Sequence, residues 1–320
     1  MLLLTEHDVQ DLFPMLRAIE CVTASFRAQH DGSAINRSRE RVFLPGTSLH
    51  YMAAGYTREK LLGMKIYTVS RDALRFLALL YDGESGALLA ILEADHLGRI
   101  RTGAASGVAT ACMARADAAR VGVIGSGRQA RTQIEAVAAV RPIRSARVFG
   151  RDRERREAFA REMAGKLGFE VIAAETAEAA VRDADVVITA TSSRDPVLKS
   201  EWLGPGTHVN AIGANMLNRR ELDDASLSRA ALIAVDTIEQ AKEEAGDLVQ
   251  GLGAIQGGWS SVIELHDIVA GVRTGRSSAS DITIFKSSGI ALWDVISADY
   301  IYRRAIEEGK GQRIPIWGEP

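Results

Sequence analysis

The sequence is poor in the residue types that define several protein classes. Only two of its 320 residues are cysteine. Both stand in apolar helical contexts, so we expect buried, reduced thiols and a cytoplasmic protein rather than a disulfide framework. The first residues lack the basic start of a signal peptide, and no apolar run reaches the roughly 20 residues of a membrane span, so no membrane partner is expected.

An excess of positive charge is also absent. Lysine and arginine number 39, and aspartate and glutamate number 41. The arginines of residues 151–156 alternate with acids, which indicates the solvated start of a helix. We therefore expect no nucleic-acid partner, and nothing in the sequence predicts a metal site. Hydrophobic residues make up 47% of the chain and charged residues 25%, proportions typical of ordinary globular proteins.

The length of the chain exceeds that of one typical domain, and its patterning changes along the sequence. Residues 15–26 have helical periodicity, whereas short β-branched and aromatic runs between 42 and 92 predict an antiparallel sheet. Beyond about residue 115, apolar runs alternate with helical segments, which predicts a parallel sheet. Its strands are expected at 120–124, 146–149, 170–173, 185–191, 208–212 and 232–235. Helical periodicity returns over 285–309, and 312–317 is typical of a last strand that rejoins the first sheet.

A glycine-rich turn joins the strand at 120–124 to the next helix, as in the doubly wound (Rossmann) sheets that bind dinucleotides. In its G-x-G-x-x-A pattern, Gly125 permits the tight turn and Gly127 lets the backbone approach a pyrophosphate. The N-terminus of the helix attracts that pyrophosphate. A turn that merely joins strand to helix is the alternative, and the β–α repeats that follow favour the nucleotide. The predicted cofactor-binding residues here are Gly125, Ser126, Gly127, Arg128 and Gln129.

The end of the next strand bears on the choice between NAD and NADP. An acid there binds a ribose 2′-hydroxyl, and an arginine accepts a 2′-phosphate. The chain has Gly150, Arg151 and Asp152, so we expect Arg151 to favour NADP(H) over NAD(H). Two alternatives stay open: Asp152 caps the following helix, and Arg151 is an ordinary surface residue.

Later strand ends supply further candidates for the cofactor. Thr191, Ser192 and Gly213 follow two of the predicted strands. Because open α/β sheets bind ligands at the carboxyl ends of their strands, we expect these residues to contact the cofactor. Capping of a loop explains the threonine and the serine equally well.

Several motifs recur in a known order and spacing. They are Met64-Lys65, Arg101 to Ala105, Gly125 to Ala130, Asn210 to Gly213, Arg220 to Asp223 and Asp281 to Gly289. In these motifs, and over nearly its whole length, the chain resembles the ornithine cyclodeaminase and mu-crystallin family. The resemblance implies a homodimer with two domains. A Rossmann dinucleotide-binding domain (116–292) is inserted into an α+β substrate-binding and dimerisation domain (1–115 plus 293–320).

The resemblance also implies roles for single residues. Arg41, Lys65 and Arg101 would hold a substrate carboxylate, with Lys65 near the site of hydride transfer. Arg101 and Thr102 would contact the cofactor. The alternatives are Arg37 or Arg39 in place of Arg41, an exposed strand-end role for Lys65, and helix-start or helix-capping roles for Arg101 and Thr102.

Two positions depart from the family's ornithine cyclodeaminase. Asn215 stands where that enzyme has an aspartate, and an amide does not take a proton from an ammonium group near neutral pH. His50, two residues before Met52, stands where it has a glutamate that holds the distal amine of ornithine. His50 is a candidate proton donor or a structural histidine. Met52 is expected to line the substrate site.

These departures favour one function among those of the family. We expect an NAD(P)H-dependent reductase that transfers a hydride to the C=N bond of a cyclic ketimine such as Δ1-pyrroline-2-carboxylate, with Lys65 and Asn215 as catalytic residues. The alternatives are ornithine cyclodeaminase, an amino-acid dehydrogenase of the alanine type, and a non-enzymatic protein that binds NADPH. The fold alone does not decide among them.

Overall fold

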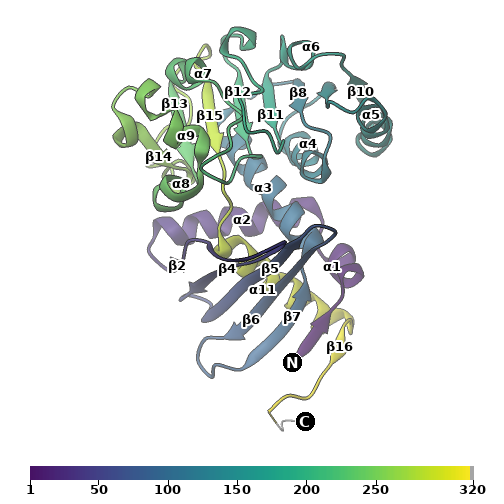
Figure 1. Cartoon of the computed structure of the whole chain (residues 1–320). Coiled ribbons are helices and arrows are strands. Elements are labelled where there is room, and N and C mark those ends of the chain that lie inside the picture. The colour runs from purple at the N-terminus through teal and green to yellow at the C-terminus, as the bar shows by residue number, and fades with distance from the viewer. Residues whose placement is uncertain (318–320) are drawn as a thin grey trace. The chain divides into compact units, whose positions relative to one another are not determined.

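The computed structural model describes residues 1–317 (Figure 1). The chain divides into two compact units. Unit 1 comprises Met1–Arg101 and the chain from Gly289 onward, and unit 2 comprises Thr102–Ser288. The boundaries expected from the sequence were 115/116 and 292/293. No helix among the described residues has both the length and the hydropathy to cross a membrane.

Unit 1 is built on a mixed sheet in the order β16-β1-β7-β6-β5-β4-β2, with β3 paired to β4. Its strands are β1 (Leu2–Leu4), β2 (Ala34–Asn36), β3 (Glu40–Leu44), β4 (Thr47–Tyr56), β5 (Leu61–Ser70), β6 (Leu74–Asp82), β7 (Leu88–Glu93) and β16 (Gln312–Arg313). Strands β3 to β7 pair antiparallel, as predicted. The strand expected over 312–317 forms only at β16, which pairs with β1, a strand that the sequence did not predict.

The helices of unit 1 cover one face of this sheet. They are α1 (Glu6–Leu12), α2 (Met15–His30) and α11 (Ala291–Glu308), while α3 (Asp95–Met113) crosses the boundary between the units. Helix α11 can approach β5 closely because Gly63 has no side chain there: a Cβ would lie 2.7 Å from a methyl carbon of Val295. Since side chains alternate along a strand, His50, Met52 and Lys65 face the same side of the sheet as this glycine.

Unit 2 is a parallel sheet of eight strands in the order β10-β9-β8-β11-β12-β15-β13-β14. The strands are β8 (Arg120–Ile124), β9 (Ser145–Phe149), β10 (Glu170–Ala173), β11 (Val186–Thr189), β12 (His208–Ala211), β13 (Leu232–Val235), β14 (Val262–Glu264) and β15 (Thr283–Lys286). The helices are α4 (Arg128–Val140), α5 (Arg153–Leu167), α6 (Ala177–Val181), α7 (Asp224–Arg229), α8 (Ile238–Glu244), α9 (Gly246–Gln250) and α10 (Leu265–Val269). The predicted α/β architecture is confirmed.

One prediction in this region was wrong at its start. Helical periodicity was expected from residue 285, but 283–286 forms β15, and the helix begins only at Ala291. All four residues of β15 are buried. A short, fully buried strand has no alternation of apolar and polar residues, so its sequence does not distinguish it from buried helix.

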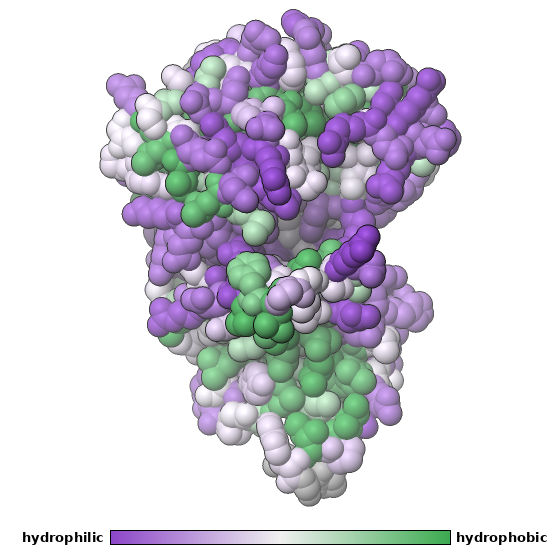
Figure 2. All heavy atoms as spheres, in the orientation of Figure 1, coloured by the Kyte–Doolittle hydropathy of each residue, from purple (hydrophilic) through white to green (hydrophobic). Residues whose placement is uncertain are grey.

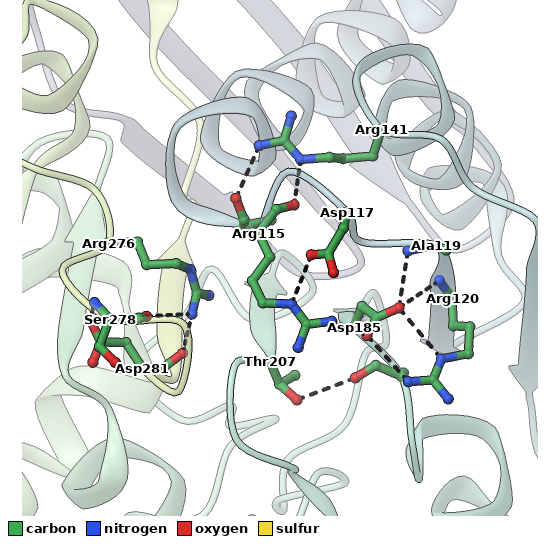
Figure 3. Close-up of polar contacts among 12 residues, drawn as sticks. Arg115, Asp117, Ala119, Arg120, Arg141, Asp185, Thr207, Arg276, Ser278 and Asp281 are labelled. Atoms are coloured by element: carbon green, nitrogen blue, oxygen red, sulfur yellow. Dashed lines mark hydrogen bonds and ion pairs between the residues drawn. The ribbon is translucent and has the colours of Figure 1, made fainter.

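The amino edge of this sheet is closed by a polar network (Figure 3). Asp185, just before β11, accepts backbone N–H bonds from Ala119 and Arg120, both at 3.0 Å, and a side-chain bond from Arg115 at 2.7 Å. Arg141 donates to the carbonyls of Thr110, Ala111 and Ala114 at the end of α3. The polar groups at this edge thus bind one another or nearby backbone, and the cofactor candidates of unit 2 follow the carboxyl ends of its strands.

Candidate active site

The predicted dinucleotide turn lies at the carboxyl end of β8, where the strand order of the parallel sheet reverses between β9 and β11 (Figure 1). Such a switch point is where open α/β sheets bind ligands. Gly125 has a φ of 116°, and a Cβ on it would lie 2.4 Å from the carbonyl oxygen of Ala190. Only glycine fits both the backbone conformation and this contact with the end of β11.

The N-terminus of α4 suits a phosphate group. Three other helices of unit 2, α5, α6 and α8, are each preceded by a residue whose side chain accepts a backbone N–H bond: Asp152, Thr176 and Thr237. Helix α4 begins after Gly127, which makes no side-chain capping bond. A Cβ on this glycine would have no atom within 4 Å, so the space beside the turn is open. The first N–H groups of α4 therefore fit a pyrophosphate.

The residues after β9, Gly150 to Asp152, bear on the choice between NAD and NADP. Asp152 caps α5, as one alternative held, since its Oδ1 accepts a backbone N–H at 3.0 Å. Arg151 is exposed. The prediction that the whole run 151–156 is solvated was wrong for Arg156, which is buried and donates to the carbonyl of Gly150 at 3.2 Å and to Glu175 at 2.8 Å.

The remaining cofactor candidates follow the neighbouring strands. Thr191 and Ser192 follow β11, and Gly213 follows β12. The backbone N–H groups of Thr191 and Gly213 both donate to the buried carboxylate of Glu221, at 2.6 and 2.7 Å. Sequence reasoning gave Glu221 no functional role. Asn215 lies two residues beyond Gly213 in the same loop.

In unit 1, three buried charged side chains from distant parts of the sequence meet. Lys65 Nζ of β5 and Arg101 Nε of α3 each donate to the same oxygen, Oδ1 of Asp294 on α11, at 3.1 Å. All three side chains are 5% exposed or less. One carboxylate thus serves two cations. The surplus positive charge, held away from water, suits a small anion such as a carboxylate.

Burial also changes the acidity of this lysine. Removal from water, helped by the charge of Arg101 and opposed by Asp294, lowers the pKa of Lys65 to about 8. Its ammonium group fits beside α3 because residue 98 is glycine, on which a Cβ would lie 2.8 Å from Nζ. A lysine with this pKa can give up a proton near neutral pH, so Lys65 can serve as a general acid.

The predicted histidine, His50, lies on the adjacent strand β4. His50 pairs across the sheet with Tyr67, and their rings stack with centroids 4.6 Å apart. Burial, together with the charges of Arg41 and Arg39, lowers the pKa of His50 to about 4. The ring is therefore neutral near pH 7 and lacks the second proton that an imidazolium ring would donate as a general acid. A second ring stack, between Tyr67 and Phe76, continues along the sheet with centroids 4.9 Å apart.

The structure thus brings together most of the substrate-binding residues predicted from the sequence. Arg41 pairs across the sheet with His50, and Met52 with Lys65. Arg39, left open as an alternative to Arg41, is buried, and its charge also lowers the pKa of Lys65. Sequence reasoning missed Asp294. The available signal was an acid set between Trp293 and Val295 on an otherwise apolar, fully buried stretch of helix.

Known proteins are similar to this chain in both sequence and structure. A sequence model described as the ornithine cyclodeaminase/mu-crystallin family matches residues 1–309. A Δ1-pyrroline-2-carboxylate reductase of Bacillus cereus is 37% identical over 264 residues, 79% of this chain and 80% of that protein. The structure of a Thermococcus litoralis Δ1-pyrroline-2-carboxylate reductase in complex with NADH and L-proline aligns with a TM-score of 0.94. It shares 36% identity and covers 98% of this chain and 100% of its own. An archaeal alanine dehydrogenase dimer with bound NAD aligns with a TM-score of 0.92 at 31% identity, over 99% of both chains.

The shared carboxylate yields a stability prediction. Asp294→Asn leaves two buried cations without an anion, so we expect the free energy of unfolding in urea to fall by about 3–5 kcal/mol. Asp299→Asn is the matched control on the same helix, because Asp299 pairs with the more exposed Arg303 and is expected to cost about 1 kcal/mol or less. Equal losses in the two variants would show that the Asp294 cluster is not held by its charge.

Proposed function

Because the chain belongs to the ornithine cyclodeaminase/mu-crystallin family, we propose that it reduces the C=N bond of a small imino acid to an L-amino acid. It is an NAD(P)-dependent oxidoreductase acting on CH–NH or CH–NH2 groups, as its relatives are. The observation that carries the finer proposal is the buried cluster of Lys65, Arg101 and Asp294, with its surplus positive charge. The substrate we propose is a cyclic ketimine such as Δ1-pyrroline-2-carboxylate.

The residues of unit 1 have distinct roles in this proposal. Arg41 and Arg101 hold the substrate carboxylate, and Met52 packs beside it. Lys65 completes the positive site and supplies a proton to the imine nitrogen, for which a pKa of about 8 is well matched. The bound reduced nicotinamide supplies the hydride. Fixing the carboxylate orients the C=N carbon, and such positioning contributes much of the rate.

The charge of the site favours an imine with an uncharged side chain over ornithine. The glutamate that would hold a distal ammonium is replaced by His50, which stays neutral near pH 7. A second ammonium group here would meet the like charges of Arg39, Arg41 and Lys65. A cyclic imine already contains the C=N bond and needs no acid to handle ammonia. Asn215 would orient the imine nitrogen or a water molecule.

The cofactor is proposed to bind at the carboxyl edge of unit 2. The turn Gly125–Gly127 and the start of α4, with Arg128 and Gln129, would hold the pyrophosphate, with Arg101 and Thr102 contributing from α3. Thr191, Ser192 and Gly213 would line the nicotinamide half. We propose NADP(H) over NAD(H), because Asp152 is used as a helix cap and Arg151 is exposed at the end of β9.

We further propose that the protein is a cytoplasmic homodimer formed through unit 1. Hydrophobic side chains gather over the strands of its sheet (Figure 2), and Leu62, Met64 and Tyr81 line a groove of about 500 Å³ there. The archaeal alanine dehydrogenase is a dimer. Both cysteines are free thiols, which fits a reducing compartment.

The proposed dimer predicts that a charged side chain placed in its interface will dissociate it. Leu62 is half exposed, and Leu62→Glu should convert a dimer into a monomer in sedimentation equilibrium, because a buried interface does not tolerate an unpaired charge. Glu59→Gln, a charge change at an exposed position nearby, is the control. If the wild-type protein is a monomer, this dimer interface is excluded. If a different protein binds this surface instead, the homodimer proposal is wrong.

The activity itself is tested with a panel of substrates. The protein with NADPH and Δ1-pyrroline-2-carboxylate should consume the reduced cofactor, followed by absorbance, and yield L-proline. Pyruvate with ammonia should be a much poorer substrate, because an open-chain imine must first form. Release of ammonia from ornithine with catalytic NAD, faster than imine reduction, would contradict the proposal. Binding of NADPH without turnover of any imine would indicate a binding protein instead.

The role of Lys65 predicts a pH dependence. The lysine must be protonated to donate a proton, so kcat/KM for imine reduction should be level below about pH 8 and fall about tenfold per pH unit above it. Lys65→Arg keeps the charge but cannot deprotonate in this range, so the variant should be slower and lack this decline. A decline that persists unchanged in the variant would assign it to another group.

The cofactor preference rests on Arg151. Removing an arginine that binds a 2′-phosphate should raise the KM for NADPH about tenfold, equivalent to about 1.4 kcal/mol, and leave that for NADH unchanged. Steady-state kinetics of Arg151→Ala with both cofactors measure this. Arg155→Ala, an exposed change in the first turn of α5, is the control. An unchanged KM for NADPH in Arg151→Ala would mean that the NADP assignment is wrong.

A further inference from the structure

A second cluster of buried charges lies in unit 2, at the carboxyl edge of the sheet. Its members are Glu221, from the segment that precedes α7, Asp247 at the start of α9, and Lys286 at the end of β15. All three residues are 1% exposed or less. None of them is among the residues assigned to cofactor or substrate above.

Both oxygens of Glu221 are used to hold two loops. Oε1 accepts the backbone N–H of Thr191 at 2.6 Å, and Oε2 accepts that of Gly213 at 2.7 Å and the hydroxyl of Thr189 at 2.9 Å. The loops also touch directly: a Cβ on Gly213 would lie 2.2 Å from the carbonyl oxygen of Thr191 and 2.5 Å from Oε1. Thr191 and Gly213 are the residues proposed to line the nicotinamide half.

The other two members fix the position of Glu221 and of the loop after β12. Asp247 Oδ1 accepts the backbone N–H groups of Glu221 and Leu222, at 2.6 and 2.9 Å, and its Oδ2 lies 3.2 Å from Lys286 Nζ. The same ammonium group donates to the carbonyl of Ala214 at 2.5 Å. The loop after β12 is therefore bound twice by the cluster: Glu221 accepts the N–H of Gly213, and Lys286 donates to the carbonyl of Ala214.

Burying a carboxylate in order to link the loops after β11 and β12 costs free energy. Lys286 pairs with Asp247, and burial raises the pKa of Glu221 while the charge of Lys286 opposes that rise. Loop closure for the fold alone does not require such a costly arrangement. An acceptor with two oxygens that takes N–H bonds from both loops at once does fix their separation. That separation matters when a rigid ring has to lie against both loops.

We propose that Glu221 is a positioning residue for the nicotinamide end of the dinucleotide, holding the loops after β11 and β12 at the spacing that the cofactor requires. This inference rests on the proposed function, since it takes a nicotinamide dinucleotide as the ligand of unit 2. Asp247 and Lys286 hold Glu221 in place. Glu221 acts through the backbone of Thr191 and Gly213.

The test replaces one oxygen of this carboxylate. In Glu221→Gln the amide NH2 group must face an N–H or O–H donor in either orientation, so at least one loop bond is lost. We expect the Kd for NADPH and NADH, measured by fluorescence titration without substrate, to rise at least about tenfold. We expect kcat to fall, while the KM for the imine stays within about twofold of wild type. Amide hydrogen exchange in peptides covering 189–193 and 212–216 should become faster.

Asp185→Asn is the matched control. Asp185 is also a buried carboxylate that accepts two backbone N–H bonds in the same sheet, but at the amino edge (Figure 3). This variant should lower the melting temperature and leave the Kd for both dinucleotides unchanged. A loss of dinucleotide affinity as large as that of Glu221→Gln would show that general destabilisation explains both, and would overturn the inference.

The outcomes separate the inference from the function on which it rests. If wild-type protein binds no dinucleotide, the proposed function fails. If it binds and reduces an imine, and Glu221→Gln matches it in Kd and kcat, only the inference fails. Should Glu221→Gln not fold, Glu221→Asp, which keeps the charge but is one methylene shorter, is expected to fold and to show the same loss of affinity. Failure of both variants to fold would assign Glu221 to the fold and overturn its positioning role.

Discussion

The sharing of one carboxylate by two buried cations is the constraint on which unit 1 depends. Removing an ion from water costs several kcal/mol even after relaxation, so Lys65 and Arg101 can be buried only where an anion meets them. That anion, Asp294, belongs to a helix near the end of the chain, 229 residues from Lys65 and 193 from Arg101. The C-terminal helix must therefore return to the first sheet, which makes unit 1 discontinuous in sequence.

The same constraint accounts for the proposed chemistry. A single Asp294 does not neutralise two cations, so the site retains a positive charge that a substrate carboxylate can complete. Burial, together with the charge of Arg101, lowers the pKa of Lys65 to about 8, which suits the lysine for the proposed role of proton donor. In unit 2 the buried cluster has two acids, Glu221 and Asp247, and one cation, Lys286, which pairs with Asp247. There the acids accept backbone N–H bonds, and the start of α4 has no side-chain cap, which fits the phosphate group proposed to bind there.

Local sequence patterns predicted many of the helices and strands, but they did not predict which residues distant in sequence pair with one another. Strands β8, β10 and β13 form at their predicted residues because each is an apolar run bounded by turns or charges. The short strands β14 and β15 carry no periodic signal, so the sequence did not predict them. Lys65 and Arg101 were predicted only through the family resemblance. Asp294 and Glu221 were not assigned roles, because what marks them is a partner distant in sequence, and no spacing rule describes such a pair.

The central claim is that a hydride passes from the cofactor to the C=N carbon of an imino acid. Reduction of Δ1-pyrroline-2-carboxylate with NADPH deuterated at C4 of the nicotinamide, followed by mass spectrometry and chiral analysis of the product, tests it most directly. The account predicts L-proline with one deuterium at Cα, transferred from one face of the nicotinamide ring only. Product that carries solvent hydrogen at Cα from both C4-deuterated stereoisomers, or no product at all, would contradict it.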